Sequence, residues 1–166
     1  MISAIVAVDN NWGIGFNGEL LEHNPVDMKH FKHLTETGIV ICGRKTWESI
    51  PNRPLSRRLA MVITNKGFKV EPGAIFLDMN HAMAHIKAVK DDNAMEWFVI
   101  GGGEIYTQLL PYCDRVYVTK FYKDHENVDT FFPNLDTLNE WEIVASTMKQ
   151  VYNDVPYQFL TYDRIS

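Results

Sequence analysis

The sequence has only two cysteines, Cys42 and Cys113, which lie far apart and form no Cys-x-x-Cys pair. This pattern argues against a disulfide framework and a metal site, and it predicts reduced thiols in the cytoplasm. Long apolar runs are absent too, since no stretch approaches the ~20 apolar residues of a membrane helix. Residues 1–9 lack a basic leader and predict a buried strand instead of a signal peptide. We therefore expect a cytoplasmic protein with no membrane partner and no metal.

Positive charge is scarce overall but concentrated in one segment. The formal net charge is −5 at pH 7, so we expect no nucleic-acid partner. Residues 29–58 carry seven basic and two acidic side chains, a local charge of +5, and the rest of the chain sums to −10. One basic segment in an acidic chain favours a small anionic ligand, although a solvated helix face followed by a surface turn would give the same pattern.

Apolar runs bounded by turn residues alternate with helical patterns. Strands are predicted at residues 2–8, 39–42, 59–64, 74–77, 97–100 and 115–121, and helices at residues 25–35, 46–50, 79–89 and 104–110. Residues 9–24 are rich in Gly and Asn and predict a long loop. The segments 142–151 and 156–162 alternate around Asn153-Asp154, which is typical of an antiparallel hairpin.

Alternation of strands and helices predicts the α/β class. We expect a mostly parallel, twisted sheet of about eight strands, helices on both faces, and an antiparallel hairpin at the C-terminus. The chain shows no repeat, low-complexity segment or linker, and its 166 residues fit a single domain over residues 1–166.

Two predicted strands end in glycine directly before a helix, at Gly43-Arg44-Lys45-Thr46 and at Gly101-Gly102-Gly103. Glycine lets a phosphate approach the backbone, and the start of a helix attracts anions through its N–H groups and dipole. Ligands of open α/β sheets bind beyond the carboxyl ends of strands, so the two ends could hold two parts of one dinucleotide. A tight turn at one end and a solvated basic turn at the other are the alternatives.

Asp27 lies in the first turn of the predicted helix 25–35, beside Met28 and Phe31 on its apolar side. It is either a helix-start acid stabilised by the dipole or a partly buried acid that faces a cleft, and the residues by themselves favour the first. Other features carry less chemistry. The pairs His30/His33 and His81/His85 lack a matching set of Cys or carboxylate ligands, and Ser49 and Ser56 lack partners for a nucleophilic triad.

Together these segments resemble dihydrofolate reductases over almost the whole chain. Order, spacing and chain length agree, and the blocks at residues 43–50 and 100–106 are the most specific. The matching pieces are residues 2–7, Gly13-Ile14-Gly15, Pro25-x-Asp27-Met28-x-x-Phe31-Lys32, Gly43-Arg44-Lys45-Thr46-Trp47-Glu48-Ser49-Ile50, Arg53-Pro54-Leu55 with Arg58, Ile100-Gly101-Gly102-Gly103-x-Ile105-Tyr106, and Asp129-Thr130-x-Phe132-Pro133.

The resemblance implies reduction of 7,8-dihydrofolate to 5,6,7,8-tetrahydrofolate by NADPH in a monomeric enzyme that antifolates inhibit. Asp27 would be the active-site acid that binds the pterin, Thr119 would link it to the substrate, and Arg58 would grip the glutamate α-carboxylate, with Arg57 as a fallback. Lys32 would assist there. The apolar walls would be Ile5, Ala7, Met28, Phe31 and Ile50. Asp27 would be too far from N5 to protonate it directly, so a water would carry the proton. The loop at residues 10–24 would close over the nicotinamide and control that water.

The resemblance also implies a set of NADPH-binding residues. Arg44, Lys45, Thr46, Thr64 and Asn65 would hold the adenine-side phosphates. Gly102, Gly103, Glu104 and Ile105 would lie along the pyrophosphate, Ala7, Ile14 and Tyr106 would flank the nicotinamide, and Gly15, Gly43, Ile100 and Gly101 would complete the set. A cis peptide bond between Gly101 and Gly102 is expected.

Four positions depart from the family pattern. Leu21 stands where proline is common, Glu22 where Trp or another large apolar residue is usual, and Asn24 where an aliphatic residue is usual. We expect Glu22 to bring a second carboxylate near Asp27 and to shift the pH–rate profile and antifolate sensitivity, unless it points to solvent or pairs with a basic residue. Asn65 replaces a frequent basic residue, so the selection of NADPH over NADH would depend more on Arg44 and Lys45.

Two other functions compete with this interpretation. The related reductase of riboflavin synthesis would share the fold and the use of NADPH but would lack the Pro-x-Asp-Met-x-x-Phe helix start. A nucleotide-binding or structural paralogue without turnover is conceivable from Glu22 and Asn24, and the presence of Asp27, Phe31 and Arg58 argues against it.

Overall fold

The structure is a computed structural model that describes residues 1–92 and 94–165. Its large sheet contains β1 (Ile2–Val8), β4 (Ile39–Gly43), β5 (Leu59–Ile63), β6 (Lys69–Glu71), β7 (Ala74–Leu77), β8 (Trp97–Gly101), β9 (Arg115–Phe121), β11 (Trp141–Ser146), β12 (Gln150–Tyr152) and β13 (Val155–Arg164). The helices are α1 (Pro25–Thr35), α2 (Arg44–Ser49), α3 (Met79–Val89) and α4 (Gly103–Leu109), with short 3₁₀ helices at Leu110–Tyr112 and Leu135–Thr137. None of the helices in the described part of the chain has both the length and the apolar character needed to cross a membrane.

The strands of the large sheet follow the order β11-β13-β9-β1-β8-β4-β5-β7-β6, and β12 pairs with β13. The six strands from β9 to β7 run parallel, which confirms the predicted mostly parallel α/β sheet. The C-terminal hairpin is antiparallel as predicted, and its turn residues Asn153 and Asp154 have positive φ values of 51° and 64°, as a two-residue hairpin turn requires.

The described residues form ten strands in this sheet, where the sequence predicted about eight. The short strand β6 was missed, and it adds a second antiparallel edge through its pairing with β7. The predicted strand at residues 142–151 is divided into β11 and β12, which pair with different parts of the long strand β13. Strands of three residues are too short to show a period of two in the sequence.

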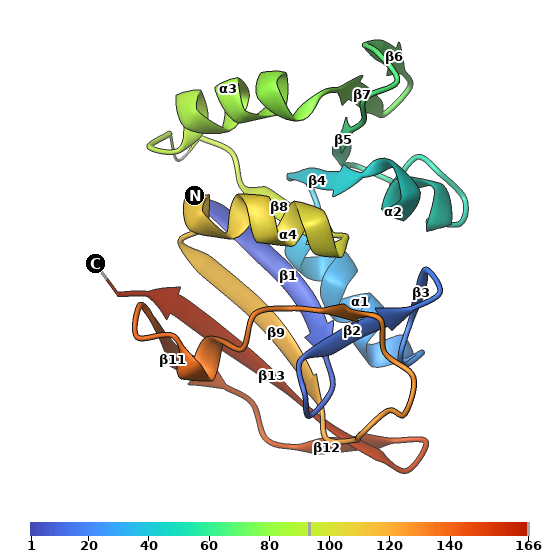
Figure 1. Ribbon diagram of the computed structural model, residues 1–166, viewed down its shortest axis with the longest axis vertical. Helices are drawn as coiled ribbons and strands as arrows, with labels where there is room; N and C mark the ends of the chain where they lie inside the picture. The colour runs from blue at the N-terminus through green and yellow to red at the C-terminus, as the bar shows by residue number, and fades with distance from the viewer. Residues whose placement is uncertain (93, 166) are drawn as a thin grey trace.

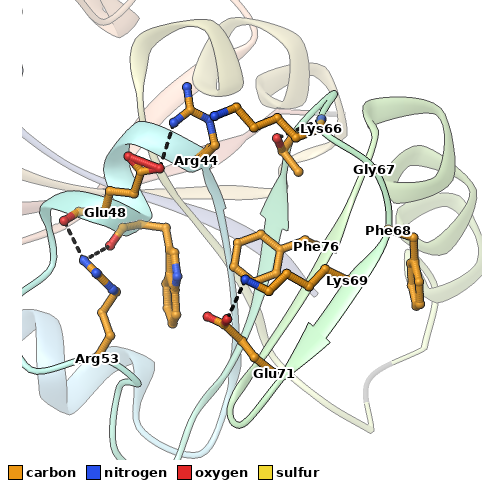
Figure 2. Close-up of a pocket in the computed structure, with 11 residues that line it drawn as sticks. Arg44, Glu48, Arg53, Lys66, Gly67, Phe68, Lys69, Glu71 and Phe76 are labelled. Carbon is orange, nitrogen blue, oxygen red and sulfur yellow. Dashed lines mark hydrogen bonds and ion pairs between the residues drawn. The ribbon is translucent and has the colours of Figure 1, made fainter.

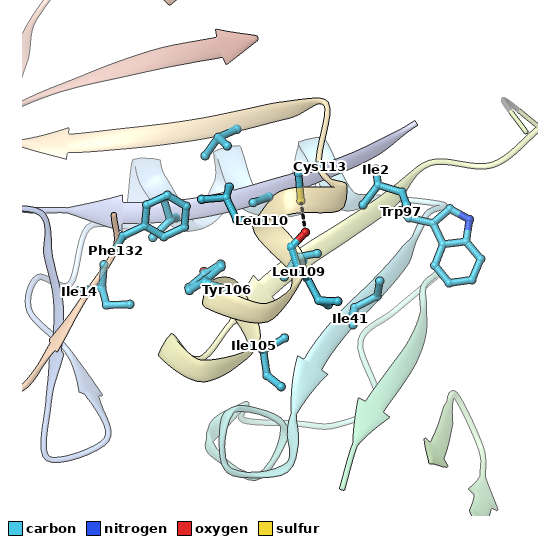
Figure 3. Close-up of a cluster of buried hydrophobic side chains, with 14 of the residues drawn as sticks. Ile2, Ile14, Ile41, Trp97, Ile105, Tyr106, Leu109, Leu110, Cys113 and Phe132 are labelled. Atoms are coloured by element: carbon cyan, nitrogen blue, oxygen red, sulfur yellow. Dashed lines mark hydrogen bonds between the residues drawn. The ribbon is translucent and has the colours of Figure 1, made fainter. Parts of the chain in front are cut away.

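The two faces of the sheet carry separate apolar cores. Ile41 and Val99 pack on one face with Leu109 of α4, whereas Val40 and Cys42 pack on the other face, because successive side chains of a strand point to opposite sides. The predicted helices on both faces are confirmed: Figure 1 shows α4 in front of the sheet and α1 behind it. Figure 3 shows Ile105, Tyr106 and Leu109 of α4 in one cluster with Ile14 and Phe132.

The predicted loop at residues 9–24 contains a β-hairpin that was not predicted. β2 (Gly13–Phe16) and β3 (Glu19–Leu20) pair with each other, and β10 (Thr130–Phe131) pairs with β2 to form a separate three-stranded sheet. Asn17 and Gly18 make the turn with φ values of 52° and 77°. The segment 9–24 is therefore tied at its middle to residues that lie more than a hundred positions later in the chain.

The close packing of the core on the α4 face predicts a loss of stability when a large side chain there is truncated. Leu109 is 0% exposed, so Leu109→Ala should lower the free energy of unfolding by about 2–5 kcal/mol, measured by urea denaturation. Met148 is 87% exposed, and Met148→Ala should change it by no more than about 0.5 kcal/mol. Equal effects of the two substitutions would contradict the described core.

Candidate active site

The first turn of α1 places the side chain of Asp27 beside Thr119 of β9. The buried side chain of Asn24 accepts hydrogen bonds from the N–H groups of Val26 at 2.9 Å and Asp27 at 3.1 Å, and Pro25 begins the helix. Asp27 Oδ1 in turn accepts a 2.6 Å hydrogen bond from Thr119 Oγ1. Asn24, one of the departures from the family pattern, thus serves as the helix cap that fixes the backbone of the acid.

Burial governs the acidity of Asp27. Withdrawal from water raises the pKa of this carboxyl above its ordinary value, and the Thr119 hydrogen bond opposes the shift. A helix-start acid in solvent would not show this shift. The structure therefore supports the second interpretation of Asp27, a partly buried acid that faces a cleft.

That cleft is a cavity of about 540 Å³ between α1, β1, β9 and the segment after α2. All nine residues that the resemblance assigns to the substrate line it: Ile5, Ala7, Asp27, Met28, Phe31, Lys32, Ile50, Arg58 and Thr119. Sequence reasoning missed further lining residues, namely Val6, Leu20, Lys29, His30, Ser49, Pro51 and Leu55. Leu20 and Met28 leave 55% and 53% of their surface exposed, and apolar walls open to a cavity are typical of a site for a small organic ligand.

We call the cavity that holds Asp27 the substrate cavity, after the residues predicted to line it, and a cation is fixed at its rim. Arg58 Nη1 donates to Thr35 Oγ1 at 3.0 Å and Arg58 Nε donates to the Ser56 carbonyl, and partial burial lowers its pKa. The fallback residue, Arg57, forms an ion pair with Glu36 at 2.9 Å and has a side chain that is 67% exposed. The structure therefore brings Arg58, and not Arg57, to the cavity that holds Asp27.

A second cavity of about 620 Å³ lies at the carboxyl ends of β4, β5 and β8. Ten of the residues predicted for the cofactor line it: Gly43, Arg44, Lys45, Thr46, Thr64, Asn65, Gly102, Gly103, Glu104 and Ile105. Lys66, Ile63 and Thr130 line it as well and were not predicted. Both glycine-ended strands thus contribute to one cavity, which we call the cofactor cavity after the predicted residues. Thr46 lines this cavity and the substrate cavity alike.

Glycine is required where the backbone turns from β8 into α4. Gly101 has a φ of +123°, in the region that side chains disfavour. A Cβ added at Gly103 would lie 2.6 Å from Thr130 Cγ2. The Gly101–Gly102 peptide bond is cis, as the resemblance predicts.

The remaining predicted cofactor residues lie outside the cofactor cavity. Ala7, Ile100 and Tyr106 line the substrate cavity, where the Tyr106 hydroxyl donates to the Ile5 carbonyl at 2.6 Å. Ile14 and Gly15 belong to β2 and Gly101 ends β8, and these three line neither of the two cavities.

A basic cavity of about 580 Å³ continues from the cofactor cavity and shares Arg44, Thr64 and Lys66 with it. Figure 2 shows Arg44 and Lys66 on one side and Lys69 with Glu71 on another. Arg44 Nη1 lies 2.7 Å from Glu48 Oε1, and this hydrogen bond is the largest cause of the lowered pKa of Glu48. The positive charge noted in residues 29–58 is divided between the sites. Arg44, Lys45 and Arg53 line these two basic cavities, whereas Lys29, Lys32 and Arg58 line the cavity that holds Asp27.

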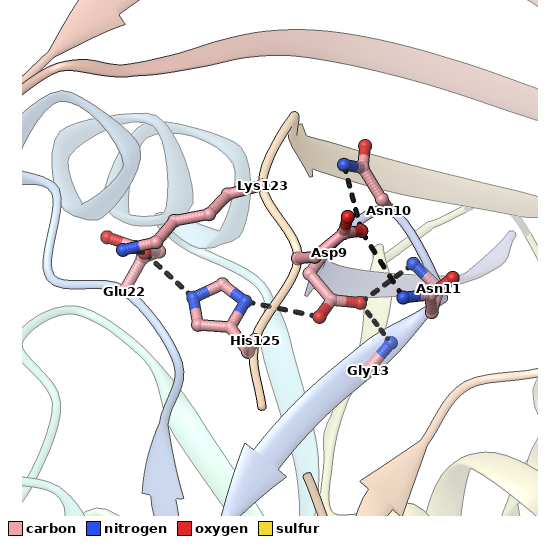
Figure 4. Close-up of polar contacts among 8 residues, drawn as sticks. Asp9, Asn10, Asn11, Gly13, Glu22, Lys123 and His125 are labelled. Atoms are coloured by element: carbon pink, nitrogen blue, oxygen red, sulfur yellow. Dashed lines mark hydrogen bonds and ion pairs between the residues drawn. The ribbon is translucent and has the colours of Figure 1, made fainter. Parts of the chain in front are cut away.

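Glu22 does not act as a second acid beside Asp27. Its Oε1 lies 2.8 Å from His125 Nε2 and 3.4 Å from Lys123 Nζ (Figure 4), so the stated alternative, pairing with a basic residue, is the one that the structure shows. Burial raises the pKa of Asp27 and the Thr119 hydrogen bond opposes this shift, and Glu22 is not among its causes.

The histidine pairs noted in the sequence have other contacts. The ring of His30 stacks on Phe159 at 3.9 Å between centroids, and His81 Nδ1 lies 2.7 Å from Asp78 Oδ1. The described residues contain no group of three or more His, Cys, Asp or Glu side chains that could hold a metal ion.

The sheet has helices on both faces and two adjoining cavities at one edge. One cavity is apolar and contains a partly buried acid, and the other is basic and lies at the glycine-ended strands. This arrangement is typical of α/β proteins that bind two ligands side by side. The chain matches the model of the dihydrofolate reductase family over residues 1–164 and belongs to that family.

Relatives and solved structures agree over nearly the full length. The chain is 39% identical to dihydrofolate reductase of Bacillus subtilis, covering 99% of this chain and 95% of that protein. It is 34% identical to dihydrofolate reductase of Sus scrofa, covering 98% and 97%. A solved structure of dihydrofolate reductase from Enterococcus faecalis, complexed with NADP(H) and RAB-propyl, superposes with a TM-score of 0.83 at 32% identity and covers 100% of this chain and 97% of that chain.

The raised pKa of Asp27 predicts a cost to stability at neutral pH. A carboxyl whose pKa is raised by folding contributes stability below its unfolded pKa, and that contribution is lost as the pH rises through the folded pKa. Asp27→Asn should therefore be more stable than the wild type at pH 7, and the difference should vanish below the ordinary aspartate pKa of about 3.9. Urea denaturation across this range tests the sign. The exposed Asp91→Asn is the control, and a destabilised Asp27→Asn at pH 7 would contradict the assigned burial.

Proposed function

We propose that this chain catalyses the NADPH-dependent reduction of 7,8-dihydrofolate to 5,6,7,8-tetrahydrofolate, with hydride transfer to C6 and protonation at N5. The observation that carries this proposal is the partly buried Asp27 in an apolar cavity that adjoins the basic cofactor cavity at Thr46. Membership of the dihydrofolate reductase family and the likeness to a complex with NADP(H) support it.

In the proposed substrate site, Asp27 accepts hydrogen bonds from the pterin ring, and its contact with Thr119 orients the carboxylate toward it. Ile5, Ala7, Met28, Phe31 and Ile50 supply the apolar walls that exclude water. Arg58, prepared by its hydrogen bond to Thr35, binds the glutamate α-carboxylate at the cavity rim with assistance from Lys32. Antifolates would occupy the same cavity.

In the proposed cofactor site, the basic and hydroxyl residues at the ends of β4 and β5 hold phosphates: Gly43, Arg44, Lys45, Thr46, Thr64 and Asn65. The turn into α4 lies along the pyrophosphate through Ile100, Gly101, Gly102, Gly103, Glu104 and Ile105. Ala7, Ile14, Gly15 and Tyr106 flank the nicotinamide. NADPH supplies the hydride when it is bound, and positioning of the two rings is the main contribution of the protein.

Protonation of N5 depends on access of water to the substrate cavity. Asp27 is held on the pterin side by the Asn24 cap and by Thr119, so we assign it the role of orienting the ring and stabilising its charge, with a water as proton carrier. We further propose that residues 1–166 form one domain that acts as a monomer in the cytoplasm, where the buried thiols of Cys42 and Cys113 stay reduced.

Asp27→Asn tests the acid directly. The amide keeps the size of the side chain but removes the charge, so kcat/KM for dihydrofolate at pH 7 should fall by about 10²–10⁴-fold, measured by the loss of NADPH absorbance. NADPH affinity by calorimetry should stay unchanged, and Asp91→Asn should match the wild type. A wild type that binds NADPH without reducing dihydrofolate would favour the paralogue without turnover.

Arg44→Ala tests the choice of nucleotide. If Arg44 binds the 2′-phosphate, the KM for NADPH should rise by about 10- to 150-fold, the equivalent of one charged hydrogen bond, while the KM for NADH stays unchanged. Lys87→Ala, which removes an exposed cation of α3, is the control. Equal losses for the two nucleotides would contradict this assignment of Arg44.

A further inference from the structure

His30 makes a second contact between α1 and the sheet, three residues after Asp27. Its half-buried ring stacks on Phe159 of β13, with 3.9 Å between the ring centroids and 24° between the ring planes. Residues three positions apart lie on the same side of a helix, and both His30 and Asp27 line the substrate cavity. The helix that carries the acid is therefore attached to the sheet at two adjacent points.

The two contact points are neighbours on the sheet as well. Phe159 lies opposite Thr119 in the antiparallel pairing of β13 with β9, and Thr119 Oγ1 donates the 2.6 Å hydrogen bond to Asp27 Oδ1. Residues directly opposite each other on two antiparallel strands point to the same face of the sheet. Thr119 and Phe159 thus contact α1 from adjoining positions, the hydroxyl at Asp27 and the ring at His30.

Buried aromatic side chains hold the ring of Phe159 in place. Tyr157, which is 1% exposed, packs edge to face against it with 5.7 Å between the centroids, and Phe121 packs against Tyr157 at 6.2 Å. Phe121, Val155 and Tyr157 form a separate buried cluster, against which Phe159 packs as a half-buried neighbour. The ring that His30 contacts is therefore fixed by the core of the sheet.

His30 meets Phe159 as an uncharged aromatic ring. Partial withdrawal from water and, second, the neighbouring His33 lower the pKa of His30 below its ordinary value of 6.5. The ring is therefore neutral at pH 7, where a stack of two rings depends on dispersion and on the apolar area that it removes from water. Such a contact requires a flat ring at position 30 and requires no charge.

We propose that His30 is a positioning residue of the reductase, whose stack on Phe159 holds α1 against β9 and β13 and thereby keeps the Asp27 carboxyl at Thr119. The inference rests on the reductase activity proposed above and assigns a further residue that acts on the same site through Asp27. Loss of the stack leaves fewer molecules with the acid in the geometry that binds the pterin ring. The cofactor cavity, which His30 does not line, is unaffected.

The first experiment compares three substitutions of His30 at pH 7. His30→Ala and His30→Gln remove the ring, so kcat/KM for dihydrofolate should fall by about 3- to 10-fold, the range expected for one aromatic contact, while the KM for NADPH stays unchanged. His30→Phe keeps a flat ring and should restore the wild-type value. His33→Ala removes the other, exposed histidine of α1 and is the matched control, which should equal the wild type.

The opposite pattern would overturn the inference. If His30 served by a hydrogen bond from its imidazole to the ligand, His30→Gln would retain activity and His30→Phe would lose it. Activity of His30→Ala and His30→Gln equal to that of the wild type would also contradict a positioning role.

The second experiment removes the ring from the other side of the stack. Phe159→Leu keeps an apolar side chain on β13 but offers no ring to His30, so it should lower kcat/KM for dihydrofolate as His30→Ala does. The double variant His30→Ala/Phe159→Leu should lose little more than either single variant, because both changes break one contact. Losses that simply multiply would show that the two residues act independently and would contradict the inference.

A double-mutant cycle with Asp27→Asn separates an effect through the acid from a direct effect on the cavity. His30→Ala should weaken dihydrofolate binding, measured by calorimetry, by about 3- to 10-fold in the wild-type background and by less than about twofold in the Asp27→Asn background. Equal losses in the two backgrounds would overturn the inference, because His30 would then act on the ligand without Asp27.

The cycle measures binding, so its outcome is separate from turnover. A wild type that binds dihydrofolate without reducing it would overturn the proposed function, and the cycle would still decide whether His30 acts through Asp27. A wild type that does not bind dihydrofolate would overturn both.

Discussion

The withdrawal of one carboxylate from water is the constraint on which the site depends. Asp27 keeps its place because Asn24 fixes the backbone of the first helical turn and Thr119 supplies a hydroxyl donor from the neighbouring element. Burial nevertheless opposes ionisation and raises the pKa of this carboxyl. Burial of the ionised carboxyl therefore lowers the free energy of unfolding, and the apolar cores of the sheet must offset this cost. Such a trade-off between stability and activity is common at functional sites.

The order of the strands explains how distant segments meet. β8, β4 and β5 are neighbours and run parallel, so their carboxyl ends bring Gly43, Thr64 and Gly102 to one edge although they are spread over nearly sixty residues. The cavity there is basic because the helix α2 starts with Arg44 and Lys45 at the same edge. Thr46 belongs to both cavities, so the same short helix that faces the cofactor cavity also forms part of the wall of the substrate cavity.

Much of this arrangement could be predicted from the sequence, because strong local patterns encode it. Long strands such as β1 and the glycine-ended turns are visible as apolar runs and breakers, and the family motifs identified the residues around Asp27. The hairpin of β2 and β3 had a local signal in its Asn17-Gly18 turn that was not used, whereas the pairing of β2 with β10, more than a hundred residues away, leaves no pattern in the sequence. Lys66 was missed for a related reason, because only the pairing of β5 with β4 places the residues after β5 at the cofactor cavity.

Glu22 shows why a departure from a family pattern must be interpreted together with its partner in space. Taken alone, an acid at this position suggested a neighbour that perturbs Asp27. The structure instead pairs Glu22 with His125, which lies 103 residues later. An apolar residue at position 22 would hold the loop by packing. The Glu22 carboxylate instead holds it through polar contacts, at 2.8 Å with His125 Nε2 and at 3.4 Å with Lys123 Nζ. The same imidazole contacts Asp9 Oδ2 through its other nitrogen at 3.1 Å, so the acid at position 22 joins the end of the loop 9–24 to its beginning through one side chain.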